Sequence, residues 1–362
     1  MRRNLLVLAI AAITIAGCKK SGGDDASSDG GGSSEPGGTT YMLQWGPVTV
    51  PANTEDTQCV ILALNNADSI KVHEIHDTIG VGSHHMIVYR DDSDTAAVTT
   101  PYNCQPFTGA LNTTGKIEPL AITQKMDDDI VLPDTVAYTF TPNQLIKIEM
   151  HYINTTDAPE PIQGNVVFTA ADASTIQNEA GLLFTGSPDI TIPANSPFTL
   201  NEQFTVPSYL DLSQSHVFAI TGHEHHLGTG VQVSVTTSPT DPGTVVYDHA
   251  EPNFSWSDPA TDQQNPAFSV PAGGGFNFTC TWTNTTSNSV SFGESACDEM
   301  CFFWAYYYPS TSSEVCIHTD MLNGSAGGMD ACCPGDPECT LIDAYLSSHA
   351  AGSGDTPTCT NM

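Results

Sequence analysis

The sequence predicts an all-β protein built from two tandem antiparallel β-sandwiches. Short runs of apolar residues, or of alternating apolar and polar residues, recur along the chain between turn residues. This pattern is typical of the strands of β-sandwiches. The 30 Gly and 24 Pro residues favour short strands and turns over long helices. The clearest strand patterns cover residues 47–50, 59–64, 86–89, 145–150, 165–169 and 276–282.

One helix is predicted over residues 338–349, because apolar residues recur at helical spacing from Leu341 to Leu346. Small and polar residues accumulate over 170–186, and the strand pattern restarts after them. We therefore place the boundary between the two sandwiches near residue 180.

The N-terminus has the features of a lipoprotein export signal. Arg2 and Arg3 precede an apolar run over residues 5–16, which is too short to be a transmembrane helix. Small residues before Cys18 resemble the lipobox of bacterial lipoproteins, in which this Cys is lipidated. The alternative is a plain signal peptide with a stray Cys. We expect a protein of the bacterial cell envelope, periplasmic or on the cell surface, attached to the membrane by the lipid alone.

The expected organisation follows from these features. A Gly-, Ser- and Asp-rich segment after the lipobox predicts a flexible linker. A Gly-rich, then Cys-rich segment ends the chain and predicts a tail stapled by disulfides. The parts are a signal peptide (1–18), a linker (19–40), an N-terminal sandwich (41–180), a C-terminal sandwich (181–320) and a Cys-rich tail (321–362).

The charge balance excludes one class of partner. Nine Lys and Arg residues stand against 41 Asp and Glu residues, which gives a formal net charge of −32. Nucleic acid would be repelled by such a surface, so we expect no nucleic-acid partner.

The cysteines predict disulfides. Setting Cys18 apart from the 11 cysteines leaves ten, and an even number in an exported chain is typical of a disulfide framework. A zinc knuckle among Cys332, Cys333 and Cys339 is the alternative, which an oxidising compartment disfavours.

Histidines form the candidate metal site. His223 and His225 follow an apolar run, and residues i and i+2 of a strand point to one face, so this pair can begin a metal site. The alternative is a polar turn rich in histidine. His84 and His85 would face opposite ways on a regular strand, so joint ligation requires a bend or a strand end there.

Four segments in this order resemble the copper type II ascorbate-dependent monooxygenases, the family of peptidylglycine α-hydroxylating and dopamine β-monooxygenases. The individual motifs are short, but together they span about residues 50 to 310. They are Asp56 to Cys59 followed by His84-His85-Met86, then Met150-His151-Tyr152, then His216 to Ala219 with His223 to Gly228, then Asp298-Glu299-Met300-Cys301 with Tyr306-Tyr307.

The resemblance implies two jelly-roll sandwiches that face a cleft with two copper ions, and ascorbate or a similar reductant as co-substrate. It implies that His84, His85 and His151 hold an electron-transfer copper, and that His223, His225 and Met300 hold the copper that binds O2. It also implies the disulfides Cys59–Cys104 and Cys280–Cys301, and leaves Cys297, Cys316, Cys332, Cys333, Cys339 and Cys359 unassigned.

The ligand types separate copper from zinc. Imidazole suits copper in both oxidation states, and a thioether favours Cu(I). Zinc seldom recruits Met, so Met300 disfavours a zinc hydrolase built on His223 and His225.

The sequence differs from the peptidylglycine enzymes at the residues that bind the carboxylate of their substrate. Those enzymes use an Arg, helped by an Asn and a Tyr, and the matching positions here are Thr221, Phe302 and Trp304. Bidentate carboxylate recognition requires an Arg. We therefore expect a monooxygenase that hydroxylates a C–H bond of another small organic substrate, more apolar or aromatic, with Thr221, Phe302 and Trp304 as candidate lining residues. Core packing of the aromatic run is the alternative for these positions, and a non-catalytic copper-handling lipoprotein is the alternative function.

Overall fold

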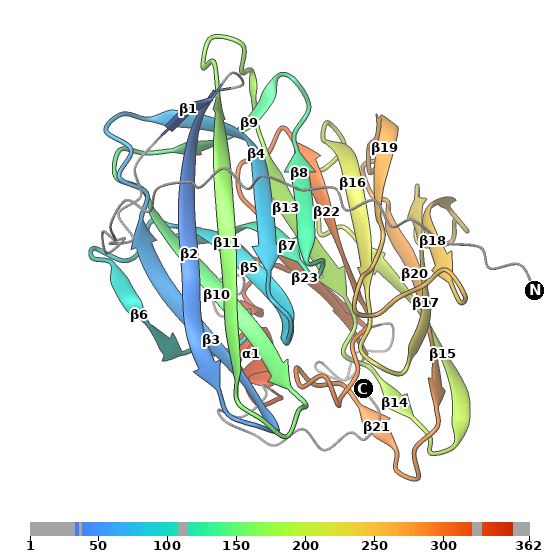
Figure 1. Cartoon of the computed structure of the whole chain (residues 1–362). Helices are drawn as coiled ribbons and strands as arrows, with labels where there is room; N and C mark the ends of the chain where they lie inside the picture. Colours follow the sequence, from blue (N-terminus) through green and yellow to red (C-terminus); the bar gives the residue numbers. More distant parts are fainter. Residues whose placement is uncertain (1–32, 36–37, 108–114, 321–327, 350–362) are drawn as a thin grey trace, which may run out of the picture.

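The computed structural model describes residues 33–35, 38–107, 115–320 and 328–349, and these form the all-β fold that the sequence predicts (Figure 1). The strands build antiparallel sheets, with parallel pairing confined to short stretches such as β12 with β9 and β13 with β23. Within the described ranges, no helix has the length and apolar character needed to cross a membrane. The signal peptide and Cys18 lie outside the described residues.

The strands before residue 180 form two sheets that pack face to face. The indole of Trp45 donates a hydrogen bond across them to the carbonyl of Gln58 (3.1 Å), and Gly164 leaves room for the side chains of Met86 and Met150. The first sheet has the order β1 (Ser33–Glu35), β2 (Gly38–Val50), β11 (Glu160–Ala171), β4 (Ile70–Ile79), β9 (Val136–Phe140) and β12 (Asn178–Glu179), with β8 (Asp127–Val131) also paired to β4. The second has the order β6 (Val98–Asn103), β3 (Thr54–Ala63), β10 (Leu145–Asn154), β5 (Ser83–Asp91) and β7 (Ile117–Thr123).

The strands after residue 180 form the second sandwich. Phe303 packs between its two main sheets, with its ring 5.1 Å from that of Phe276 and 5.9 Å from that of Phe278. One sheet has the order β19 (Thr261–Phe268), β16 (His216–His223), β22 (Phe302–Tyr308), β13 (Gly181–Gly186), β23 (Glu314–Thr319) and β24 (Met329–Cys333). The other has the order β15 (Ser196–Thr205), β20 (Gly275–Asn284), β17 (Gly228–Thr236) and β18 (Thr244–Ala250), and a small sheet pairs β14 (Thr191–Ile192) with β21 (Val290–Ser291).

The two sandwiches meet through the five-stranded sheet of the first and the six-stranded sheet of the second. The backbone N–H of Ile122 on β7 donates to the hydroxyl of Tyr306 on β22 (3.3 Å). Ser313, before β23, donates to the carbonyl of Pro119 on β7 (2.9 Å). These bonds are buried, so the facing sheets enclose the region in which the histidines lie.

Both ends of the folded part differ from expectation. Strand β2 begins at Gly38, so its first residues belong to the sandwich and not to the predicted linker. Residues Met329–Cys333 of the predicted tail belong to the second sandwich, because they form β24, which pairs with β23 as an edge strand. The helix predicted there is confirmed as α1 (Cys339–Ser347).

Candidate metal centre

His84, His85 and His151 come together at a β-bulge. His151 on β10 pairs with His85 on β5, whereas the next residue, Tyr152, pairs with Ser83, so His84 is the extra residue of the bulge. A bulge breaks the alternation of side chains along a strand. Both His84 and His85 are therefore buried on the side of His151, which is the bend that joint ligation requires.

Hydrogen bonds fix the ring of His151. Its Nε2 lies 2.8 Å from Oε1 of Glu55, and its Nδ1 lies 3.3 Å from Nε2 of His85. Burial raises the pKa of Glu55, but its bonds with His151, Ala296 and Ser295 outweigh that effect and the pKa is lowered. An ionised carboxylate only accepts hydrogen bonds, so His151 Nε2 carries the proton and Nδ1 is the available donor atom for a metal.

His223 and His225 also lie side by side, with ring centroids 5.1 Å apart. His223 is the last residue of β16, whereas His225 lies in the turn that leads to β17. The pair thus meets at a strand end and not along a regular strand. Nδ1 of His223 lies 3.0 Å from Oε1 of Gln124, and Nδ1 of His225 lies 3.1 Å from the carbonyl of Asp298.

The two histidine groups are one cluster between the sandwiches. The ring of His84 lies 5.1 Å from those of His85 and His151, 5.2 Å from that of His225 and 6.1 Å from that of His223. Candidate ligand atoms lie within 4.8 Å of one another in two groups, and His84 belongs to both.

The cluster fits a metal that takes neutral nitrogen ligands. Burial lowers the pKa of His84, His85 and His223 well below its usual value, and lowers that of His225 to about 4, with the neighbouring imidazoles adding to the shift. The buried atoms His84 Nε2, His85 Nδ1 and His223 Nε2 have no hydrogen-bond partner. Buried polar atoms are normally paired, so these lone pairs are suited to a metal such as copper.

Met300 lies two residues before the aromatic strand β22, beside an apolar cavity lined also by Phe107, Phe184 and Phe302. The ring of Phe107 is 5.5 Å from that of His85, so this cavity adjoins the histidine cluster. Coordination by Met300 remains a prediction.

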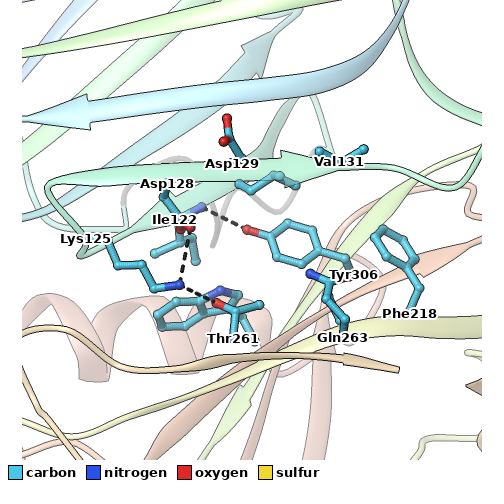
Figure 2. A pocket seen from close by; sticks show the side chains of 12 residues that line it. Ile122, Lys125, Asp128, Asp129, Val131, Phe218, Thr261, Gln263 and Tyr306 are labelled. Carbon is cyan, nitrogen blue, oxygen red and sulfur yellow. Dashed lines mark hydrogen bonds and ion pairs between the residues drawn. The ribbon is translucent and has the colours of Figure 1, made fainter. Parts of the chain in front are cut away.

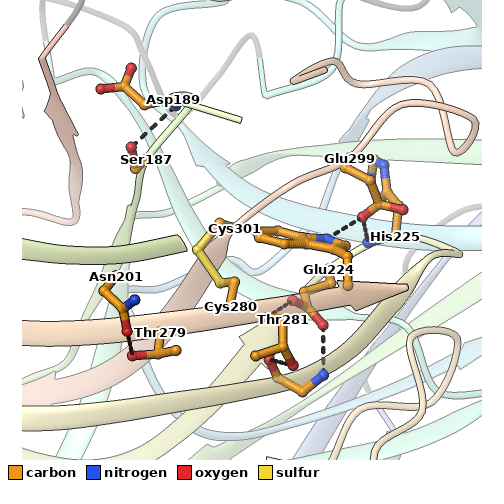
Figure 3. The surroundings of a disulfide bond; sticks show 12 residues. Ser187, Asp189, Asn201, Glu224, His225, Thr279, Cys280, Thr281, Glu299 and Cys301 are labelled. Carbon is orange, nitrogen blue, oxygen red and sulfur yellow. Dashed lines mark hydrogen bonds between the residues drawn. A yellow bond between two sulfur atoms is a disulfide. The ribbon is translucent and has the colours of Figure 1, made fainter. Parts of the chain in front are cut away.

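Disulfides anchor the strands around the site. Cys59–Cys104 and Cys280–Cys301 are bonded, and these are the pairs that the resemblance implies. The second joins β20 to the residue after Met300 (Figure 3). Two further bonds, Cys316–Cys332 and Cys333–Cys339, staple the tail. The zinc-knuckle alternative is therefore wrong, because Cys332, Cys333 and Cys339 are oxidised.

Glu299 holds the turn that carries His225 (Figure 3). Its carboxylate accepts hydrogen bonds from the backbone N–H groups of His225 (3.0 Å) and Leu227 (2.7 Å) and from the indole of Trp282 (2.8 Å). Burial raises the pKa of Glu299 to about 8. His226, in the same turn, bonds the carbonyl of Ala296 through Nδ1 (2.7 Å), which indicates a structural role.

The three predicted lining residues lie between the sandwiches. Thr221 is buried and its hydroxyl lies 2.8 Å from that of Thr261. Trp304 lines a cavity of about 110 Å³ between β7, β8 and the six-stranded sheet (Figure 2), and its ring is 6.0 Å from that of His223. Phe302 instead stacks on Phe184 beside Met300, with ring centroids 4.9 Å apart.

Sequence reasoning missed several residues that contact the histidines, and three of them reach across from other segments. Glu55 and Gln124 are hydrogen-bonded to His151 and His223, and the ring of Trp256 lies 5.7 Å from that of His84. Glu55 directly precedes the Asp56 to Cys59 motif, and this position is the only hint of its role that the sequence offers. Gln124 and Trp256 carry no motif, because each reaches its histidine from the opposite sandwich.

Comparison with known protein families gives an informative match. Residues 178–323, which carry His223, His225 and Met300, match the family model "Copper type II ascorbate-dependent monooxygenase, C-terminal domain". Among solved structures, the chain is similar to the major capsid protein P2 from bacteriophage PM2 (8% identity, 75% of this chain, 99% of that chain, TM-score 0.32). It is also similar to N-glycanase F (10% identity, 76% of this chain, 90% of that chain, TM-score 0.29). Both TM-scores are too low for these structures to support a conclusion about function. Residues 178–323 are therefore similar to the C-terminal domain of the copper type II ascorbate-dependent monooxygenases.

Proposed function

We propose that the protein hydroxylates a C–H bond of a small organic substrate, using O2, copper and a one-electron reductant such as ascorbate. The family match supports a function of the same kind, that of a copper- and ascorbate-dependent monooxygenase. The observation that carries the finer proposal is the buried cluster of neutral imidazoles between the sandwiches, with lone pairs that the protein leaves unpartnered.

The roles of the ligands follow the resemblance. His84, His85 and His151 would hold the electron-transfer copper, and His223, His225 and Met300 the copper at which O2 reacts. Copper would supply electron transfer, oxygen activation and C–H cleavage, which no side chain can supply. The chain positions the imidazoles: Glu55 and Gln124 fix the rings of His151 and His223, so that one nitrogen of each faces the site.

The cavity beside Trp304 supports a small substrate that meets both apolar and polar side chains, because Lys125, Asp128 and Gln263 line it together with aromatic rings. At about 110 Å³ it is comparable to cavities that hold one aromatic ring. Phe218 and Tyr306 face it, and Lys125 is the one positively charged residue among those that line it (Figure 2). Lys125 lies 3.4 Å from Asp128 and so is already paired. A peptide C-terminal glycine would find no free guanidinium there, which supports the exclusion of that substrate.

Export as a lipoprotein is part of the same proposal. The apolar leader and lipobox motivate it, and the disulfides suit an oxidising compartment such as the periplasm or cell surface. Mass spectrometry of the protein from bacterial membranes would detect a lipid on Cys18, and Cys18→Ala should release the protein from the membrane. A membrane-bound Cys18→Ala protein would contradict the anchor.

The test of the activity is product formation. Copper-loaded protein supplied with ascorbate and O2 should hydroxylate at least one member of a panel of small aromatic and aliphatic compounds, and leave a glycine-extended peptide unchanged. His225→Ala, prepared in parallel, should lose the activity. The proposal fails if no member of a broad panel is hydroxylated.

A non-catalytic copper-handling lipoprotein is the second candidate. The burial of Thr221, Phe302 and Trp304 favours it, because these positions leave little open surface for a substrate beside the histidines. Copper binding without reductant-dependent consumption of O2 would identify this function. Zinc as the bound metal, with hydrolytic activity, would contradict both candidates.

A further inference from the structure

Asp77 is a buried acid whose carboxylate oxygens are not hydrogen-bonded. It lies on β4 and alternates with Ile75 and Ile79, so its side chain points into the first sandwich and is fully buried. Among the residues that the structure describes, neither Oδ1 nor Oδ2 of Asp77 has a hydrogen-bond partner. A buried carboxylate without a partner is costly, and buried polar atoms are normally paired. Asp77 therefore points to a ligand that the chain itself does not supply.

A second carboxylate faces Asp77 from the neighbouring strand β8. The register of the two strands pairs Asp77 directly with Asp128. Residues paired in this way present their side chains on one face of the sheet, with Cβ atoms about 4.5–5.5 Å apart. Burial raises the pKa of Asp77 well above its usual value, and the charges of Asp128 and Asp129 add to the shift. The carboxylates of Asp77 and Asp128 are thus close enough to share a cation.

The turn between β7 and β8 adds two uncharged oxygens. The hydroxyl of Thr123 lies 3.4 Å from Oδ2 of Asp128 and 3.3 Å from the backbone carbonyl oxygen of Lys125. Hydrogen bonds between oxygens are usually about 2.7–2.8 Å long. The three oxygens therefore converge loosely, on the face of the sheet to which Asp77 points.

The nearby positive charges do not reach Asp77. The ammonium group of Lys125 lies 3.4 Å from the other oxygen of Asp128, Oδ1 (Figure 2). His76 and Asp129, on the opposite face of β4 and β8, pair with each other at 2.6 Å. Lys125 thus compensates one oxygen of Asp128, and the charge of Asp77 is left for another cation.

We propose that these oxygens bind Ca²⁺ between β4 and the turn that precedes β8. The ligands would be the carboxylates of Asp77 and Asp128, the hydroxyl of Thr123 and the backbone carbonyl of Lys125. Ca²⁺ is a hard cation that takes about six to eight oxygen ligands, with water completing the set. Because the site offers oxygen alone, it differs in chemistry from the histidine cluster.

The cation would hold in place a turn that contacts the second sandwich. Gln124 belongs to this turn, and its side-chain carbonyl lies 3.0 Å from Nδ1 of His223. The backbone carbonyl of Met126, two residues on, accepts a hydrogen bond from Ile79 at the end of β4 (3.1 Å). Ca²⁺ would add a second link between β4 and the turn, so its role is structural.

Calorimetric titration of the full-length, copper-free protein with Ca²⁺ tests the site. The wild type should bind one Ca²⁺ per chain more tightly than its acidic surface does, and should melt at a higher temperature in Ca²⁺ than in NaCl of equal ionic strength. Asp77→Asn keeps the volume of the side chain but removes its charge. It should weaken this binding by about tenfold or more and abolish the rise in melting temperature.

Asp127→Asn is the matched control. It removes a carboxylate from the same strand, but alternation directs this side chain to the face opposite Asp128. Both Ca²⁺ binding and melting should stay as in the wild type. The proposal is overturned if Asp77→Asn binds Ca²⁺ as tightly as Asp127→Asn, or if the wild type shows only the weak binding of its surface.

Thr123→Val guards against a folding defect in Asp77→Asn. It leaves both carboxylates in place and removes one uncharged oxygen, so it should weaken Ca²⁺ binding less than Asp77→Asn does, with circular dichroism unchanged. Affinity equal to that of the wild type would remove Thr123 and count against the site. Tighter binding of Mg²⁺ than of Ca²⁺ would overturn the choice of cation.

Terbium luminescence gives an independent readout. Tb³⁺ replaces Ca²⁺ in oxygen sites and luminesces when a nearby aromatic ring is excited. Trp304 and Tyr306 line a cavity together with Asp128, so Tb³⁺ at the site should luminesce on their excitation and be displaced by Ca²⁺. Luminescence that persists in Asp77→Asn would overturn the proposal. No measurement here requires copper or a substrate, so the outcome is independent of the proposed hydroxylation.

Discussion

The carboxylate of Glu55 joins His151 to the second sandwich. Its Oε1 lies 2.8 Å from Nε2 of His151 and accepts the backbone N–H of Ala296 at 2.8 Å, while Oε2 accepts the hydroxyl of Ser295 at 2.8 Å. Glu55 is on β3 of the first sandwich, and Ser295 and Ala296 follow β21 of the second. One buried carboxylate therefore orients an imidazole of the histidine cluster and holds the two sandwiches together.

Replacement of Glu55 should weaken copper binding at the proposed site of His84, His85 and His151. In Glu55→Ala, His151 loses the acceptor that fixes its Nε2 proton, and we expect copper affinity at this site to fall about 10–100-fold. Competition with a chelator measures the affinity, and the copper hyperfine splitting reports the change of ligand environment.

Glu55→Gln is the matched control. Its amide oxygen can still accept the bonds from His151 and Ala296, so most of the affinity should return. A Glu55→Ala protein that binds copper within about twofold of the wild type would show that Glu55 does not position His151.

Met300→Ala should abolish carbon monoxide binding to the reduced protein. A thioether favours Cu(I), the state that binds carbon monoxide, so its loss should shift the centre of His223 and His225 toward Cu(II). Infrared spectroscopy of the reduced protein under carbon monoxide detects the adduct. Met329→Ala, on the edge strand β24, controls for loss of a buried methionine. Unchanged carbon monoxide binding in Met300→Ala would remove Met300 from the ligand set.

Loss of the Cys280–Cys301 disulfide should lower the free energy of unfolding by about 3 kcal/mol, since it closes a loop of 21 residues. Denaturant unfolding of the Cys280→Ala/Cys301→Ala protein measures the loss. The same double variant frees the residue next to Met300, so the carbon monoxide adduct should also change. Cys333→Ala/Cys339→Ala, which opens a bond between residues only 6 apart, should cost less and leave the adduct unchanged.

The sequence alone predicted the fold class and the histidine motifs, because both rest on local patterns. The repeated pattern of short strands and turns predicted the sandwiches. The helical spacing of apolar residues after Glu338 predicted α1. The expectation that His84 and His85 need a bend followed from the two-residue period of a strand, and the structure meets it with a bulge.

The remaining features depend on contacts between distant segments. His223 lies 99 residues from Gln124 in the sequence, and His151 lies 96 from Glu55, so no local pattern links them. Within the aromatic run, strand alternation already separates Phe303 from Trp304. The sequence could not predict which of the two faces the core. In the structure, Phe303 packs in the core of the second sandwich and Trp304 faces the first sandwich.

Stability should depend on pH through His318, which links the edge strand β24 to β15 within the second sandwich. On β23, its Nδ1 lies 2.7 Å from Asp330 on β24 and its Nε2 lies 3.3 Å from Glu202 on β15. Burial by itself lowers the pKa of His318, but the hydrogen bonds and charges of Asp330 and Glu202 outweigh it and raise the pKa to about 10. Because the folded-state pKa lies above the ordinary value of 6.5, the stabilisation is complete below pH 6.5 and is lost as the pH rises through about 10.

His318→Gln should therefore destabilise the protein at low pH and much less at high pH. We expect a loss of about 1–2 kcal/mol near pH 6, after allowance for solvent screening of the ion pairs, and almost none above the folded-state pKa. Urea unfolding of both proteins over this range measures the difference, with exposed His216→Gln as the control. A loss that stays constant from pH 6 to above 10 would show that His318 stabilises the sheet by packing and not by charge.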